Sequence, residues 1–303
     1  MVTLMPKFDF IDVVTKDKLL LPALVFEPTS STKRTALIYV HGLGGDFYSN
    51  SEKANAFAEE CNKYGFAFLT FNNRGSGYDA AVKKLDSKTD KGFVRVAAGR
   101  TYEKFSDCVY DIGAVISQAK KRGYNKIILI GHSTGANKVI YYLYKNQNQK
   151  NIVASVLTGA LSDVPIQRKL SGKSYPKILA LAKMLYKKGK GSVLLPEGSS
   201  DSPITAQRFL SLCVEKSEED VFQYYLQNPA FTQLKSLKIP ALFIIGEKDE
   251  YATTKPNQIL KTYSKLKSNF ETVLIKGSLH SFNKMEKKLA KIVCTWINKK
   301  VTL

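Results

Sequence analysis

Short apolar runs recur along the chain, and each predicts a strand. Between most of these runs the apolar residues repeat with helical spacing, as Val109, Ile112 and Ile116 do. Alternating buried strands and helices predict a mostly parallel sheet with helices on both faces, which is an α/β fold. The strands are expected at Phe8–Val14, Leu20–Phe26, Thr35–Val40, Phe66–Phe71, Lys126–Ile130, Ile152–Leu157, Ile239–Ile245 and Glu271–Ile275. The helices are expected at Ser51–Tyr64, Tyr102–Arg122, from the 130s to about Asn146, at Asn257–Lys267 and from the 280s to about Lys299.

The strand–helix alternation stops between Val164 and Leu237. This segment predicts helices at Tyr175–Lys187, Ser202–Cys213 and Glu218–Gln227, separated by loops rich in Gly, Ser and Pro. We therefore expect a core domain made of residues 1–163 and 238–303, with residues 164–237 inserted as a helical cap. Residues 80–100 are polar and are expected to form an irregular surface excursion.

The composition is that of a globular protein. Of 303 residues, 44% are hydrophobic and 24% charged, which argues against disorder. No apolar run approaches the ~20 residues that span a bilayer, and the N-terminus lacks the apolar core of a signal peptide. We therefore expect a cytoplasmic protein. The four cysteines lie far apart without a C-x-x-C pair, which predicts reduced, buried thiols over disulfides or a metal site: Cys61, Cys108, Cys213 and Cys294.

The chain is strongly basic, with 46 Lys and Arg against 26 Asp and Glu and a net charge of +20. Such a charge is typical of nucleic-acid-binding proteins, but the lysines are scattered and no helix-turn-helix, zinc-finger or RNA-recognition motif is present. The pattern therefore argues against a nucleic-acid partner. The basic field would also favour anionic substrates. The lysine-rich helix at Tyr175–Lys187 is read as an amphipathic helix packed on the core, with a membrane-surface contact as the less favoured alternative.

The sequence Lys126–Asn137 combines a buried strand, the pentapeptide GHSTG and a predicted helix. A G-x-S-x-G sequence between a strand and a helix is typical of a nucleophile elbow. The sharp turn presents the Ser133 side chain at a helix N-terminus, where backbone N–H groups face developing negative charge. The pentapeptide alone is weak evidence, so the rest of the chain must supply the partners of a nucleophile.

A glycine-rich turn, His41–Gly45 (HGLGG), follows the strand at Thr35–Val40. Glycines let the backbone approach a substrate and leave N–H groups free to donate hydrogen bonds. With the residue after the elbow serine, such a turn forms an oxyanion hole. The predicted donors are the backbone N–H groups of Leu43 and Thr134. A plain strand-to-helix turn is an equal alternative for the glycine-rich sequence taken alone.

The chain has only three histidines, and each lies at a predicted strand end. His41 and His132 adjoin the glycine-rich turn and the elbow, and both are interpreted as structural. His280 follows the last strand and is the candidate general base.

The candidate acid is Asp249, at the end of the strand after the insertion. Its rivals are Asp163, at the end of the preceding strand, and Glu247. Position favours Asp249, because strand ends at one edge of a parallel sheet converge. It also gives the chain order Ser133, Asp249, His280.

From about Thr35 to Lys299 the chain resembles α/β-hydrolase-fold serine hydrolases with a helical cap, the group that includes monoglyceride lipases, serine aminopeptidases and carboxylesterases. The motifs that carry the resemblance occur in order: HGLGG, NNRGSG, GHSTG, GEKDE and GSLHSF. The cap matches in position only. GHSTG and GALSD give a fainter similarity to fungal siderophore-ester hydrolases. In the NNRGSG loop, Arg74 is expected to stabilise loops.

The resemblance implies hydrolysis of a small carboxylic ester through an acyl-enzyme, by a triad of Ser133, His280 and Asp249. It implies no metal and no cofactor. A peptidase, a thioesterase or an acyltransferase on the same triad stays open. A non-catalytic binding protein that uses the basic surface is the alternative from another class. The sequence leaves the charge of the substrate and the oligomeric state undetermined.

Overall fold

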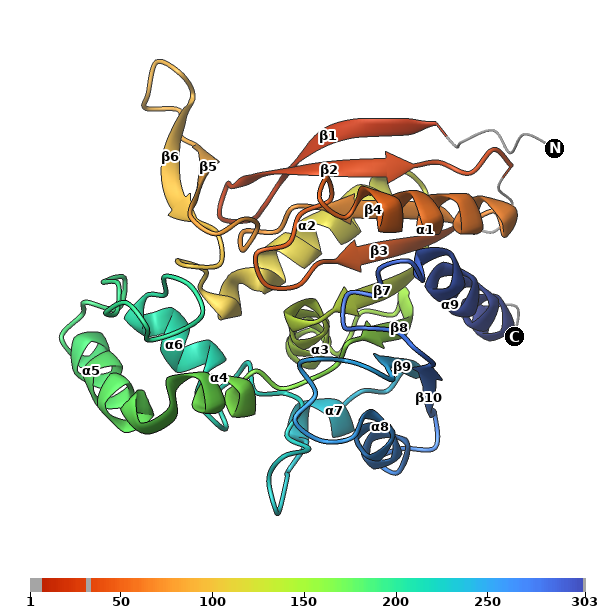
Figure 1. Cartoon of the computed structure of the whole chain (residues 1–303). Coiled ribbons are helices and arrows are strands. Elements are labelled where there is room, and N and C mark those ends of the chain that lie inside the picture. Colours follow the sequence, from red (N-terminus) through yellow and green to blue (C-terminus); the bar gives the residue numbers. More distant parts are fainter. Residues whose placement is uncertain (1–6, 31–33, 302–303) are drawn as a thin grey trace.

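A twisted eight-stranded sheet runs through the middle of the molecule (Figure 1). The computed structural model describes residues 7–30 and 34–301. The strand order is β1-β2-β4-β3-β7-β8-β9-β10, and every neighbouring pair from β4 to β10 is parallel. The strands are β1 (Phe8–Val14), β2 (Leu20–Phe26), β3 (Thr35–Val40), β4 (Ala67–Phe71), β7 (Lys126–His132), β8 (Ile152–Thr158), β9 (Ala241–Gly246) and β10 (Phe270–Ile275).

Helices cover both faces of this sheet, because its central strands are apolar on both sides. One face packs against α1 (Ser51–Lys63) and α9 (Glu286–Val301), which also contact each other. The other face packs against α2 (Cys108–Lys121), α3 (Thr134–Lys145) and α8 (Pro256–Ser264). The predicted α/β architecture is confirmed.

Between β8 and β9 the chain forms a helical insertion, residues 164–237. Its helices are α4 (Val164–Ser171), α5 (Tyr175–Lys187), α6 (Ala206–Leu212) and α7 (Thr232–Lys235), with a 3-10 turn at Gly172–Ser174. The part around α5 and α6 has an apolar cluster of its own, built on Ala182, Phe209 and Leu212. The last part joins the main core instead, through Phe222 and Leu234.

Two segments differ from their predicted structure. Residues 80–100 are not irregular: β5 (Ala80–Leu85) and β6 (Phe93–Ala98) form an antiparallel hairpin that follows the strand period of two in its burial. Residues 218–227 form no helix. There Glu219 and Asp220 make side-chain contacts with Arg208 and Ser162, so tertiary contacts override the local helical pattern.

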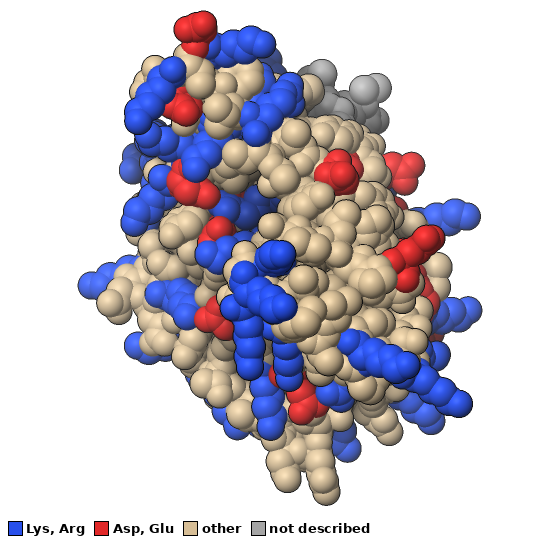
Figure 2. Space-filling view, turned by 90° about the vertical axis from the view of Figure 1, so that its left-hand side faces the viewer, with Lys and Arg blue, Asp and Glu red and all other residues tan. Residues whose placement is uncertain are grey.

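All four cysteines are buried and free, as expected. Cys61 Sγ lies 3.6 Å from Cys294 Sγ, where α1 and α9 meet. Among the described helices, none combines the length and the hydropathy that crossing a membrane would require. Figure 2 shows Lys and Arg side chains spread over one whole face, in no single stripe, with fewer acidic residues among them.

Candidate active site

The carboxyl ends of the parallel strands bring the candidate residues to one edge of the sheet. The site cavity has a volume of about 250 Å³, and its lining includes Leu43, Ser133 and His280. These residues follow β3, β7 and β10, which are separated by long stretches of sequence. Residues from α4 and the preceding loop also line the cavity, so the insertion forms part of the wall.

Ser133 occupies the turn between β7 and α3 in a conformation that non-glycine residues rarely adopt, with φ 54° and ψ −129°. Its N–H donates to the Thr158 carbonyl of β8 at 2.9 Å, which fixes the turn against the sheet. Neighbouring glycines make the turn possible: a Cβ on Gly131 would lie 2.5 Å from Ala136 Cα, and one on Gly135 only 2.1 Å from the Val40 carbonyl oxygen.

His280 and Asp249 are in direct contact. His280 Nδ1 lies 2.8 Å from Asp249 Oδ2 and 3.0 Å from Oδ1, and both residues are buried. The Nδ1–H donates to the carboxylate, which leaves Nε2 as the acceptor nitrogen. The backbone N–H of His280 donates to Glu250 Oε2 at 2.9 Å, so the loop itself is also held. No hydrogen bond joins Ser133 to His280 within residues 7–30 and 34–301, although both line the site cavity.

The rival acids lie elsewhere. Glu247 Oε2 accepts a hydrogen bond from the N–H of Gly277 at 2.8 Å, so it fixes the loop after β10. Asp163 lines the cavity from the start of α4, and no hydrogen bond joins it to His280. Of the three candidate acids, the structure brings Asp249 to the imidazole.

The other two histidines support the backbone around the cavity. His41 Nε2 accepts the N–H of Asn73 at 3.0 Å, so Nδ1 carries the proton and donates to the Gly42 carbonyl at 2.8 Å. Burial and then the nearby Lys138 lower the pKa of His41 to about 4. Burial, with Lys53 and His280, lowers the pKa of His132 well below its usual value. Both imidazoles are therefore neutral at pH 7.

The glycine-rich turn passes close to the serine. A Cβ on Gly42 would lie 2.7 Å from Ser133 Cβ and 3.3 Å from its Oγ, so only glycine allows this approach. Leu43 lines the cavity beside it. Thr134 is the first residue of α3, where helix geometry leaves a backbone N–H without an i−4 partner. The two predicted donors thus belong to residues next to Gly42 and Ser133 in the sequence, and these two residues approach each other closely.

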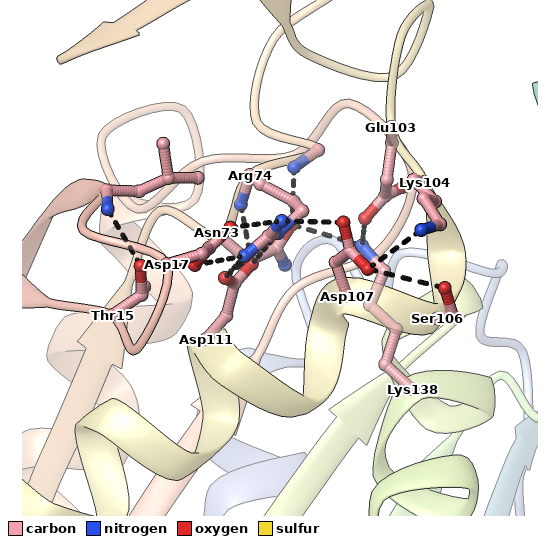
Figure 3. A network of polar contacts seen from close by, with 12 residues as sticks. Thr15, Asp17, Asn73, Arg74, Glu103, Lys104, Ser106, Asp107, Asp111 and Lys138 are labelled. Carbon is pink, nitrogen blue, oxygen red and sulfur yellow. Dashed lines mark hydrogen bonds and ion pairs between the residues drawn. The ribbon is translucent and has the colours of Figure 1, made fainter. Parts of the chain in front are cut away.

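Arg74 lies outside the cavity lining and binds three carboxylates from two other segments of the chain (Figure 3). Its guanidinium donates to Asp111 at 2.7 Å, to Asp17 at 3.1 Å and to Asp107 at 3.2 Å. These contacts join the β1–β2 turn, the loop after β4 and the start of α2. Arg74 therefore stabilises loops, as the sequence analysis expects.

A second buried ionic cluster, which the sequence analysis did not anticipate, lies beside it (Figure 3). Lys138 of α3 pairs with Glu103 at 2.5 Å, and Lys138 Nζ also donates to Asn73 Oδ1 at 3.0 Å. Arg208 of α6 lies 3.3 Å from Glu103 and donates to Glu219 at 2.9 Å. Periodicity gives no signal for such a cluster, because charged side chains are ordinarily assigned to solvent.

No group of three or more His, Cys, Asp or Glu side chains in the described part of the chain is arranged to hold a metal ion.

Comparisons with known proteins agree with the fold. Residues 84–302 match the model of a family described as "Protein of unknown function (DUF1749)". UPF0613 protein PB24D3.06c of Schizosaccharomyces pombe is 24% identical over 255 residues, which is 78% of this chain and 75% of that protein.

Solved structures that resemble this chain include esterases and lipases. Est1E from Butyrivibrio proteoclasticus with bound ferulic acid has a TM-score of 0.66 at 18% identity, covering 97% of this chain and 100% of that chain. A soluble variant of monoglyceride lipase from Saccharomyces cerevisiae with a substrate analog has a TM-score of 0.62 at 15% identity, covering 99% and 97%. These likenesses confirm the predicted α/β-hydrolase fold.

Proposed function

We propose that this chain, which belongs to the family described as a protein of unknown function (DUF1749), hydrolyses carboxylic esters through Ser133, His280 and Asp249. The observation that carries the proposal is the 2.8 Å contact between His280 Nδ1 and Asp249, in a cavity that Ser133 also lines. The esterase and lipase names of the structural neighbours support an ester as the substrate.

In the proposed reaction, His280 Nε2 removes the proton of Ser133 Oγ as the oxygen attacks the ester carbonyl. Asp249 accepts the Nδ1–H, which orients the imidazole and stabilises its charged form. The imidazolium then protonates the leaving alcohol, and an acyl-enzyme remains on Ser133. Water repeats the sequence and releases the acid.

The oxyanion of each tetrahedral intermediate would be held by the backbone N–H groups of Leu43 and Thr134. A donor of this kind is worth about 3–4 kcal/mol of barrier. The neutral state of His132, whose ring centroid lies 5.1 Å from that of His280, also matters. A second imidazolium there would disfavour charge on His280 and would raise the barrier.

The experiment is labelling by a fluorophosphonate probe together with turnover of p-nitrophenyl esters of graded acyl length. Wild-type protein should be labelled at Ser133 and should release p-nitrophenol, and Ser133→Ala should do neither. Ser106→Ala is the matched control, because Ser106 lies in the 3-10 turn Phe105–Asp107, just before α2, and outside the cavity lining. Labelling or turnover that survives in Ser133→Ala would refute the proposal.

A further inference from the structure

Two side chains at the start of α4 line the site cavity one helical turn apart. Asp163 is the N-cap residue of α4 and Gln167 lies four positions later, so they share one face of the helix about 6 Å apart along its axis. Ser133 of the elbow lines the same cavity. The proposed mechanism uses neither of them.

Both side chains present acceptor oxygens without a partner. An aspartate at an N-cap ordinarily accepts a hydrogen bond from the helix, but the Asp163 side chain makes no such bond. Its carboxylate accepts no hydrogen bond from any described residue. Gln167 is only 4% exposed, and its Oε1 also has no partner among the described residues. Because Gln167 Oε1 is buried without a donor, it costs free energy, which a ligand that supplies the donor recovers.

The other charged groups of the cavity are already occupied. Arg100 donates to Asp201 at 2.8 Å and lies over the Tyr78 ring at 5.1 Å. Among the Lys, Arg, Asp and Glu side chains that line the cavity, Asp163 is therefore the one that makes no ion pair with another described residue, whereas the outer surface of the protein is strongly basic.

We propose that Asp163 and Gln167 form a recognition subsite for a hydrogen-bond donor, an ammonium or hydroxyl group, carried by the ester substrate. This inference rests on the proposed function and extends it to a substrate class. The donor would bind between the two oxygens, and the ester carbonyl would lie at Ser133 in the same cavity. The subsite thus selects against esters that are apolar throughout.

The electrostatic surroundings of Asp163 agree with this assignment. Burial and then the nearby Glu219 raise its pKa to about 7, although Arg208, His280 and Arg100 oppose the rise. A carboxyl that is costly to ionise without a partner becomes a strong acceptor once a cation arrives, because the cation favours the carboxylate. An ammonium-bearing ester should therefore bind with release of a proton near pH 7.

The test compares esters matched in shape. 2-(Dimethylamino)ethyl butanoate carries an ammonium N–H where 3-methylbutyl butanoate carries a C–H, and 2-hydroxyethyl butanoate is paired with propyl butanoate. The ratio of kcat/KM within each pair is measured at about pH 8, where Asp163 is ionised, for wild type, Asp163→Asn and Gln167→Leu. Glu215→Gln is the matched control, since this carboxylate pairs with Arg168, also on α4, and does not line the cavity.

We expect wild type to prefer a donor-bearing ester about tenfold or more, as a hydrogen bond to a charged group implies. Asp163→Asn should remove most of the ammonium preference, Gln167→Leu should reduce it several-fold, and Glu215→Gln should keep it. A preference for either donor ester that Asp163→Asn loses supports the subsite. Equal ratios in wild type and Asp163→Asn overturn it.

Failure of the subsite is distinguishable from failure of the proposed function. If none of the four esters is hydrolysed and the fluorophosphonate probe does not react, the proposed function is wrong. The affinities of the paired esters for Ser133→Ala, measured by titration calorimetry, still test the subsite in that case. Tighter binding of a donor ester that is lost in Ser133→Ala/Asp163→Asn supports it, and equal affinities refute it.

Discussion

Lys138 Nζ lies 2.5 Å from Glu103 Oε1, and neither side chain exposes more than 1% of its surface to solvent. Lys138 belongs to the helix that starts at the proposed nucleophile. Glu103 also lies 3.3 Å from Arg208 of α6, so this carboxylate joins the core to the insertion. The position of the insertion over the cavity thus depends on charges that water does not reach.

Removing one member of this cluster should destabilise the protein strongly. Lys138→Met leaves Glu103 with Arg208 as its remaining ion-pair partner, and breaking a buried pair costs about 3–5 kcal/mol. Urea unfolding followed by circular dichroism measures the loss. The control is Lys63→Met, which breaks an ion pair whose lysine side chain is 58% exposed and should cost less than about 1 kcal/mol. A loss in Lys138→Met no larger than in the control would contradict a structural role for the cluster.

Asp249→Asn should lower kcat by about 10⁴-fold with the fold intact, because His280 would lose the acceptor that sets its tautomer and orientation. The measurement is steady-state hydrolysis of a p-nitrophenyl ester. Glu247→Gln is the matched control: it changes an acid two residues away whose contact is with Gly277. If the control lost as much activity as Asp249→Asn, Asp249 would not be the acid of the triad.

Gly42→Ala should impair the chemical step more than the fold. The new methyl group would meet Ser133 Cβ at 2.7 Å and the His132 carbonyl oxygen at 2.9 Å, so Ser133 must move. A displacement of about 1 Å at a reacting atom costs about 10²-fold in rate. Single-turnover acylation by a p-nitrophenyl ester measures it. Gly113→Ala in α2 is the control, since its Cβ comes no closer than 3.8 Å to a neighbour, and an unaltered acylation rate in Gly42→Ala would be the contrary result.

The stability difference between wild type and Asp163→Asn should depend on pH. The pKa of Asp163 in the fold is about 7, above the ordinary 3.8, so the folded state binds the proton more tightly than the unfolded chain. The stabilisation of the fold by the proton on Asp163 is complete below about pH 4. It is lost as the pH rises to about 7, at about 1.4 kcal/mol per pH unit. The free energy of unfolding of Asp163→Asn should therefore rise relative to that of wild type as the pH increases over this range.

Unfolding free energies at intervals between about pH 4 and pH 8 check this expectation. Ser171→Ala, also on α4, serves as the control because neither its hydroxyl nor the replacement titrates in this range. The difference in unfolding free energy between Ser171→Ala and wild type should stay constant over the pH range. A constant offset for Asp163→Asn as well would show that Asp163 has an ordinary pKa.

Elements whose pattern is local were predicted well. The run Thr35–Val40 became β3 with every residue buried, and the helix predicted at Tyr175–Lys187 has those bounds in the structure. Strand period, helical period and glycine-rich turns are properties of neighbouring residues, so they can be recognised before the chain is folded.

Elements that depend on distant contacts were missed. Residues 218–227 carry a helical pattern, but Glu219 turns inward to meet Arg208 and the helix does not form. The α4 helix was not anticipated either, and it provides Asp163 and Gln167 to the cavity wall. No sequence rule indicates that Glu103, Lys138 and Arg208 are buried together, because each is assigned to solvent when taken alone.

The amino-acid sequence by itself determined the order of the eight strands of the main sheet and the helices that cover it, the elbow at Ser133 and the short set of candidates for its partners. Only the tertiary structure decided which acid meets His280, where the insertion contacts the core and which acceptors remain unpaired in the cavity. The physical reason is the separation along the sequence over which each kind of interaction acts. Backbone propensity and side-chain periodicity act over a few residues, whereas ion pairing, burial and hydrogen-bond satisfaction can join residues more than a hundred positions apart, as they do for Glu103 and Arg208.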